Sequence, residues 1–422
     1  MTGIDIMIAA LRAAVVFGLV ISALPILIWM ERKGAAYIQD RRGPNRAHIL
    51  GIRLGGLVHT IADVIKLFTK EEVTARGALR PLVYLAPIIA FFAATATVAA
   101  VPFSGPISVA GRTLTFEVAN IQAGLVYVFA ISSLGAYALV LAGWTSQNTY
   151  SFLGAMRAAS QFLSYELALG MAAISIFLVA GSLSLTDIAA DQGAAVWRWN
   201  AIRQPLAFLI FTTALFAEAS RLPFDLPEGD SEIVAGYHVE YSSMRFAMFY
   251  MAEYAHIFVG SAVIATLFFG GWNVPFADQS LIAANADRIV AVAWPIFALA
   301  LMLGGAKLAG RFRRRFKDMR DYEPVMIGVP SIIAGMALAG LYVMHGGWLL
   351  DAEWLPAAVA FATGFIAMLT KTMIISALFI WVRWTLPRFR YDQVMAFGWK
   401  MLLPAGLLNL VVTAGIMMYL KD

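Results

Sequence analysis

Acidic residues gather in one stretch of an otherwise apolar chain. Residues 221–241 read RLPFDLPEGDSEIVAGYHVEY and carry five carboxylates: Asp225, Glu228, Asp230, Glu232 and Glu240. Apolar side chains alternate with these acids, so we expect part of the stretch to fold back against neighbouring helices. Carboxylates that lie close together in a poorly solvated place cannot all ionise, and they share protons as a coupled set. The pattern favours a proton-handling or cation-binding cluster over the alternative, a solvated acidic loop.

Ionisable residues also stand in or beside apolar segments. Glu166 lies in SYELALG and Glu253 lies in MAEYAHIF. A charge at bilayer depth costs about 2.5–3.5 kcal/mol on insertion scales, so such a residue usually faces a cavity or a partner. These glutamates suit a site that binds and releases protons, and the alternative is an interfacial side chain that reaches water. Lys371, in the middle of a later apolar segment, has the same two interpretations.

The composition indicates that these groups are positioned by a membrane protein. The chain is 61% hydrophobic and 14% charged, and apolar runs of about 20 residues recur along it. The runs are continuous rather than alternating, which favours spanning helices over a barrel. Cysteine is absent, so the chain can hold neither an iron–sulfur cluster nor a disulfide, and it contains no nucleotide-binding loop or HExxH pair. Electron chemistry must therefore come from a partner.

We predict an all-α integral membrane protein that forms a single polytopic domain over residues 1–422. Ten spanning helices are expected near residues 5–30, 81–102, 120–143, 162–182, 203–221, 246–271, 288–310, 325–345, 356–382 and 401–420. The connections 31–80, 311–324 and 383–400 are rich in Arg and Lys, so the positive-inside rule places them in the cytoplasm and the N-terminus outside. The acidic loop 222–245 falls on the same cytoplasmic side.

One segment that is too short to span still has a helical pattern. Residues 54–70, LGGLVHTIADVIKLFTK, repeat apolar side chains at steps of three and four, with His59, Asp63, Lys66 and Lys70 on a second stripe. We expect an amphipathic helix at the cytoplasmic interface whose apolar face meets lipid or a lipid-soluble ligand. A plain surface anchor is the alternative.

Several blocks of sequence resemble a known family. They read ERKGAAYIQDRRGPNR, IADVIKLFTKE, GAMRAASQFLSYE, EASRLPFDLPEGDSEIVAGYHVEYSSMRFAMFYMAEY and RWTLPRFRYDQVMAFGWKMLLP, in order from residue 31 to about residue 410. They are similar to the quinone-site membrane component, the H subunit, of bacterial proton-translocating NADH:quinone oxidoreductase, which is respiratory complex I. Residues 273–350 match no part of that pattern, so we expect an insertion that adds two helices to the eight of the family.

The resemblance implies a place at the junction of the membrane arm and the peripheral arm, in the bacterial plasma (inner) membrane. It implies a proton path through Asp63, Glu166, Glu218, Glu228, Asp230, Glu232, Glu240 and Glu253. It also implies a quinone tunnel at Arg32, Arg41, Arg46, Asp63, Phe224 and Asp225. FMN and iron–sulfur clusters are then expected only in partner subunits, and this chain would hold no catalytic residue or metal of its own. The other expected partners are small and antiporter-like membrane-arm subunits and lipid, with no nucleic acid.

Two other classes share some of these features. The homologous component of a hydrogenase or formate hydrogenlyase type complex keeps much of the scaffold, but it tends to lose parts of the loop and tunnel motifs. A stand-alone ion transporter also buries carboxylates, but such proteins often show paired repeats and broken helices, and we find no repeat here. The full acidic stretch favours the quinone reductase. Either ubiquinone or menaquinone fits the sequence.

Overall fold

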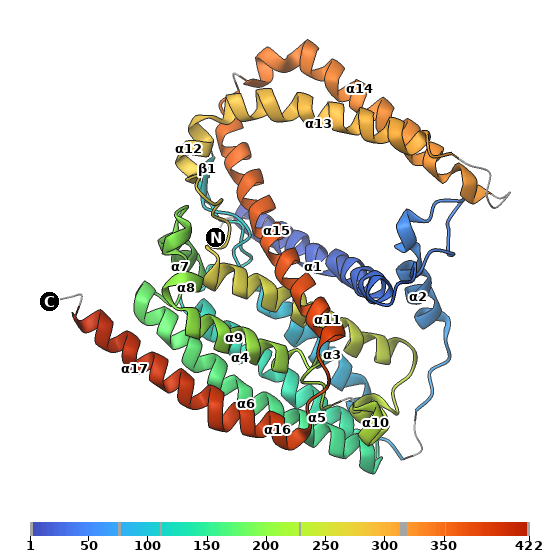
Figure 1. Cartoon of the computed structure of the whole chain (residues 1–422), viewed down its shortest axis with the longest axis vertical. Helices are drawn as coiled ribbons and strands as arrows, with labels where there is room; N and C mark the ends of the chain where they lie inside the picture. The colour runs from blue at the N-terminus through green and yellow to red at the C-terminus, as the bar shows by residue number, and fades with distance from the viewer. Residues whose placement is uncertain are drawn as a thin grey trace.

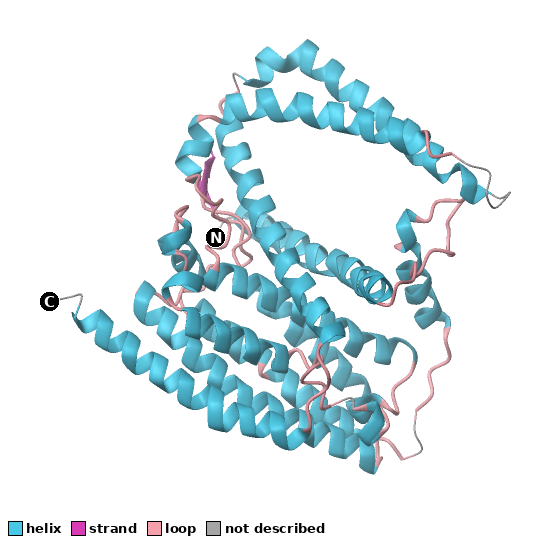
Figure 2. Ribbon diagram, in the orientation of Figure 1, coloured by secondary structure: helices cyan, strands magenta, loops and turns pink. Residues whose placement is uncertain are grey.

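The computed structural model describes the backbone of residues 3–74, 77–109, 112–227, 229–312, 319–350 and 352–419. Within these ranges, the description of side chains leaves out residues 3–5, 107–109, 112–114, 230, 231 and 345–349. Helices dominate the described chain (Figure 2), as the composition predicts.

Nine helical segments are long and apolar enough to cross a bilayer in the described ranges. They are α1 (Gly3–Ile38), α3 (Arg80–Ala96) with η2 (Thr97–Ala100), α4 (Gly124–Ser132) with α5 (Leu134–Thr145), α6 (Thr149–Ala180), α11 (Ser243–Phe268), α13 (Ala286–Ala309), η5 (Met319–Tyr322) with α14 (Glu323–Leu350), α15 (Leu355–Thr385), and α16 (Tyr391–Phe397) running through η6 (Gly398–Leu402) into α17 (Leu403–Tyr419). The prediction of an all-α integral membrane protein is confirmed.

The fifth predicted span is shorter than the others. It corresponds to α9 (Pro205–Glu218), which follows the single turn of α8 (Asn200–Arg203). A helix of 14 residues extends about 21 Å at 1.5 Å per residue, less than the hydrocarbon thickness of about 30 Å. Arg203 and Glu218 bound the apolar centre of this segment, so α9 ends inside the protein and brings Glu218 to a buried depth.

The connecting elements are short. They are η1 (Leu54–Gly56), α2 (Val58–Thr69), β1 (Ile107–Val109), β2 (Arg112–Leu114), α7 (Leu185–Gln192), η3 (Val196–Arg198), α10 (Asp230–Ile233), η4 (Gly236–His238) and α12 (Gln279–Ala284). Strands β1 and β2 pair antiparallel, with Ile107 opposite Leu114. Of residues 54–70, Leu54–Gly56 form η1 and Val58–Thr69 form α2, along which Ile61, Ile65 and Phe68 are exposed; the interfacial position stays a prediction.

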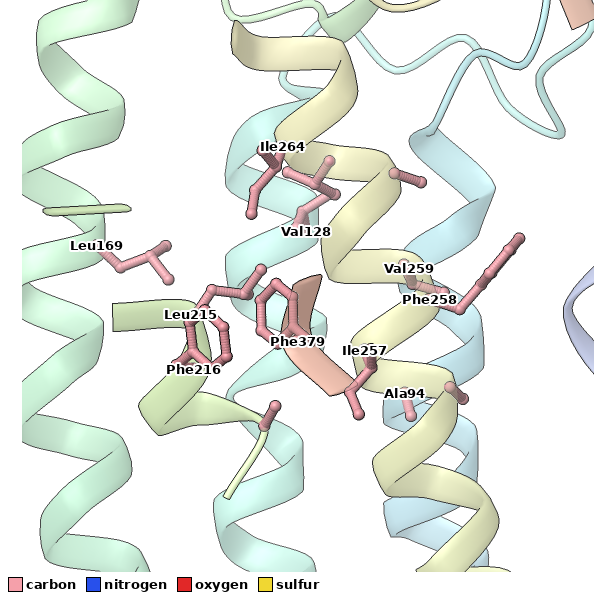
Figure 3. Close-up of a cluster of buried hydrophobic side chains, with 14 of the residues drawn as sticks. Ala94, Val128, Leu169, Leu215, Phe216, Ile257, Phe258, Val259, Ile264 and Phe379 are labelled. Carbon is pink, nitrogen blue, oxygen red and sulfur yellow. The ribbon is translucent and has the colours of Figure 1, made fainter. Parts of the chain in front are cut away.

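The core is centred on α11. In the most apolar stretch of α11, 83% of the residues are buried. In the corresponding stretches of α13 and α14, 11% of the residues are buried. Figure 1 shows α13 and α14 as a hairpin that stands apart from the bundle around α11. Close contact between α9 and α11 depends on a glycine, because a Cβ added at Gly260 would lie 2.7 Å from Leu215 Cδ2. In Figure 3, Leu215 and Phe216 point into this core, where the ring of Phe216 stacks on Phe379 at 3.8 Å.

Lys371 is partly buried, and backbone carbonyls bind its ammonium group. Its Nζ donates hydrogen bonds to the carbonyl oxygens of Phe269 (2.7 Å), Gly271 (2.9 Å) and Asn273 (2.6 Å), just beyond the C-terminal end of α11. The ammonium also lies 4.6 Å from the centroid of the Trp199 ring. Unpaired carbonyls at a helix C-terminus attract a cation, so Lys371 fastens α15 to the end of α11.

Candidate functional site

Two cavities lie beside α2 and share one lining residue. The polar cavity, of about 500 Å³, is lined by Glu31, Arg32, Ala35, Arg41, Gly43, Pro44, Asn45, Arg46, His59 and Trp384. The apolar cavity, of about 360 Å³, is lined by Ile28, Arg32, Thr60, Asp63, Val64, Lys66, Leu67, Met244, Phe246, Ala247, Tyr250 and Met251. Arg32 borders both, and the elements around them are α1, α2 and α11. Four of the six tunnel residues predicted from the resemblance therefore line this pair of cavities.

An ion pair and two hydrogen bonds hold the residues that line the two cavities. Arg32 Nη1 lies 2.5 Å from Asp63 Oδ2, which ties α1 to α2. The backbone N–H groups of Arg46 and Ala47 both donate to His59 Nε2 at 3.1 Å. These two hydrogen bonds hold the turn before α2 against His59.

Glu31 connects the polar cavity to the interior. Its carboxylate pairs with Arg383 of α15 and accepts a 2.6 Å hydrogen bond from Tyr254 Oη. Tyr254 Oη in turn lies 3.1 Å from Tyr250 Oη, and Tyr250 borders the apolar cavity. A chain of polar atoms therefore runs from both cavities toward the middle of α11.

The next buried pair is Arg221 with Glu253. Arg221 Nη2 lies 2.8 Å from Glu253 Oε2, and the two side chains are 3% and 10% exposed. Tyr237 Oη donates to the other carboxylate oxygen at 3.1 Å. The guanidinium carbon lies 4.5 Å from the Tyr254 ring centroid, so this cation also touches the tyrosine that holds Glu31.

Glu218 and His256 border two smaller cavities. One, of about 30 Å³, also touches Glu253. The other, of about 20 Å³, continues to Ser132 and Leu169. A cavity needs roughly 10–15 Å³ to hold one water, so each has room for one or two. The polar chain therefore extends from Glu253 to Glu218 through a space of water size.

The remaining acids of the stretch have separate partners. Glu232 pairs with Arg157 at 2.7 Å, and Glu240 accepts a 2.8 Å hydrogen bond from Asn148 Nδ2. Glu166 lies half-buried on α6, and its charge acts on Glu218. Glu228 and the side chain of Asp230 lie outside the described residues. The expectation of one coupled cluster therefore differs from the structure, in which Glu232 and Glu240 bind to α6 and its N-cap instead.

Asp225 faces a different region from the one predicted. Its Oδ2 lies 2.8 Å from Arg388 Nη2. Burial raises the pKa of Asp225 to about 6, and the Arg388 guanidinium opposes that rise. The adjacent Phe224 packs against Tyr165 and lines a third cavity, of about 780 Å³, between α9, α15 and α16. Phe224 and Asp225 thus lie away from the cavities that Arg32 joins.

Several residues of this polar chain were not predicted as site residues. They are Glu31, Arg221, Tyr250, Tyr254 and His256. Three of them stand in the block MAEYAHIF or just before it, and Arg221 and Glu31 flank predicted ends of apolar segments. The signal that could have found them is the four-residue step from Tyr250 to Tyr254, which places both hydroxyls on one face of a helix.

The fold and the site define a polytopic helical membrane protein with an interfacial cavity connected to buried carboxylates. The NADH dehydrogenase family matches residues 11–414. The chain belongs to the H-subunit family of NADH-quinone oxidoreductase, and it is a multi-pass membrane component of that oxidoreductase complex. This membership confirms the resemblance seen in the sequence.

Relatives match along nearly the whole chain. An H subunit of NADH-quinone oxidoreductase from Solibacter usitatus is 38% identical over 97% of this chain and 96% of its own length. The H subunit of the enzyme from Flavobacterium psychrophilum is 35% identical, with 96% of each chain covered. NADH-quinone oxidoreductase subunit 8 of Rhodothermus marinus is 36% identical, again with 96% of each chain covered.

Proposed function

We propose that this subunit supplies the membrane-side quinone cavity of the complex. The observation that carries the proposal is that a polar and an apolar cavity share Arg32 as a lining residue. A quinone has a polar head ring and an apolar tail, and such a ligand would match two neighbouring cavities of these characters. Arg41 and Arg46 face the half that the head ring would occupy. Asp63 and Val64 line the half for the tail.

The same cavities support a role in proton translocation. Reduction of a quinone creates or demands negative charge, and one unit charge acts on another 4 Å away with about 4 kcal/mol at an effective dielectric of 20. Glu31 lies at the cavity wall, and Tyr254, Arg221 and Glu253 continue inward from it. A charge change in the cavity would therefore bias the protonation of the carboxylates behind it.

Electrons in this proposal come from outside the chain. FMN and iron–sulfur clusters belong to partner subunits, and the terminal cluster would approach the polar cavity from the peripheral arm. The basic connections and the acidic loop face the cytoplasm, where that arm docks. Small and antiporter-like membrane subunits complete the membrane arm. The quinone would enter the apolar cavity from the bilayer.

A pair of matched variants tests the cavity assignment. Val64 lines the apolar cavity, and its neighbour Ile65 is exposed and does not line either cavity. Val64→Trp should fill the tail half and raise the KM for quinone by about tenfold, since a misfit of a few methylenes costs about 1–3 kcal/mol. Ile65→Trp should leave quinone kinetics unchanged. NADH oxidation by a water-soluble acceptor should be normal in both. Equal quinone kinetics in the two variants would contradict the proposal.

A further inference from the structure

The hairpin of α13 and α14 meets the bundle again beside η1 and α2. Figure 1 shows α14 beginning close to this segment, far from the place where α12 leads into α13. Residues 273–350 contain the whole hairpin and were expected from the sequence to be an insertion of unassigned role. Since α13 and α14 are mostly exposed, the contact near residue 323 is a specific attachment of an otherwise outlying element.

Glu323, the first residue of α14, makes this attachment. Its Oε1 accepts hydrogen bonds from the backbone N–H groups of Arg53 (2.8 Å) and Leu54 (2.9 Å), and its Oε2 lies 2.6 Å from Arg53 Nε. The Glu323 and Arg53 side chains are 11% and 16% exposed. η1 has no side-chain cap of its own, so Glu323 supplies one from a distant part of the chain.

A second contact depends on the local backbone and is independent of charge. Gly51 has a φ of +92°, and a Cβ added there would lie 2.5 Å from the carbonyl oxygen of Met319. Glycine is needed for both reasons, because other residues avoid that φ and would collide with the approaching chain. The two segments therefore fit together at the backbone level as well as through Glu323.

The segment that Glu323 holds is bordered on both sides by residues that line the polar cavity. We call residues 47–57 the latch loop. Its base is closed by the hydrogen bonds from Arg46 and Ala47 to His59 Nε2, and Trp29 Nε1 donates to Gly55 O at 3.1 Å. Arg46 and His59 line the polar cavity. A shift of the latch loop would therefore move both of these side chains and the start of α2.

We infer that Glu323 is a positioning residue for the quinone cavity, through which the inserted hairpin fixes the latch loop and the wall attached to it. The attachment of the hairpin to the latch loop rests on the contacts of Glu323, Arg53 and Gly51. The effect of this attachment on quinone binding rests in addition on the proposed function. The hairpin thus acts on a site that it does not itself line.

Amide hydrogen exchange in the assembled complex tests the latch. Glu323→Ala should speed exchange at the N–H groups of Arg53 and Leu54 by about tenfold or more, as expected when a charged acceptor is lost. The matched control is Glu353→Ala, an exposed carboxylate at the other end of the hairpin, and it should leave these amides unchanged. If Glu323→Ala prevents assembly, Glu323→Gln, which removes the charge of the group that accepts from both amides, provides the same readout. Unchanged exchange in the assembled variant overturns the latch.

Quinone kinetics test the effect on the cavity. Glu323→Ala should raise the KM for a short-chain quinone by roughly threefold to tenfold, with kcat and reduction of a water-soluble acceptor little changed. A merely structural role would lower the amount of complex and leave KM unaltered. Val64→Trp in the same assay reports on the proposed function by itself. A raised KM for Val64→Trp with a normal KM for Glu323→Ala overturns the inference. Faster exchange in Glu323→Ala with normal kinetics in both variants would preserve the latch but refute the cavity assignment.

Discussion

Replacing Arg388 should make the stability of the protein depend on pH in a defined way. Asp225 is 9% exposed at its side chain and pairs with Arg388, which is 26% exposed. Its pKa of about 6 lies above the ordinary value of 3.8, so in the native protein the stability contributed by Asp225 is lost as pH rises from about 4 to 6. Above pH 6 the carboxylate is ionised and paired, and this contribution becomes constant.

Arg388→Met removes the opposing cation and leaves burial to act alone. The pKa of Asp225 then rises further, because burial is the largest influence on it and Arg388 the next. For each pH unit above 6, the free energy of unfolding of the variant falls by about 1.4 kcal/mol relative to the native protein. The fall ends at roughly 3–5 kcal/mol, which is typical of a buried charge without its partner. The deficit should therefore be well under ~1 kcal/mol at pH 6 and roughly 2–3 kcal/mol at pH 8.

The assay is the thermal inactivation of the assembled complex at pH 6 and pH 8. The controls are Asp225→Asn and the double variant that combines Arg388→Met with Asp225→Asn. Asp225→Asn cannot ionise, so the double variant should lose the added pH dependence of Arg388→Met. Glu253 and Arg221 also act on Asp225 and remain in all the variants. An equal deficit at both pH values, or a double variant as pH-sensitive as Arg388→Met, would refute the reasoning.

Two further substitutions test the polar chain and the helix attachment. Glu218→Gln should abolish proton pumping while assembly survives, because an amide at the junction of the two small cavities cannot carry a proton; full pumping in reconstituted vesicles would contradict this role. Lys371→Met should lower the stability of the complex by about 3 kcal/mol because three carbonyls lose a charged donor. Thermal inactivation measures this loss, and Lys371→Arg should retain most of the stability.

The sequence predicted the membrane helices well because long apolar runs are a local property of the chain. The amphipathic α2 was predicted for the same reason, from side chains a few positions apart. The partners of the acids were not predicted, because they depend on tertiary packing. Glu31 and Arg383, for example, are 352 residues apart in sequence. Charge alone suggested that the acids of residues 225–240 act together, whereas packing gives the described ones separate partners.

The least predictable part was the attachment of the hairpin. Glu323 opens a helix, and a carboxylate there is common because it favours that helix's own N-terminus. Nothing in its sequence neighbours indicates that it instead binds N–H groups near residue 53. The cavities themselves were predicted only through the resemblance, since a cavity depends on the shapes of several elements at once.

The position of Glu218 between two separate small cavities has a consequence for the order of events. Each cavity has room for only one or two waters, and the carboxyl borders both. On the proposed proton path, a proton that passes from one cavity to the other would therefore reside on this carboxyl between two hops. The rotamer of a single side chain would then decide which cavity receives the proton, so the direction of transfer would be set by a bond rotation rather than by movement of a helix.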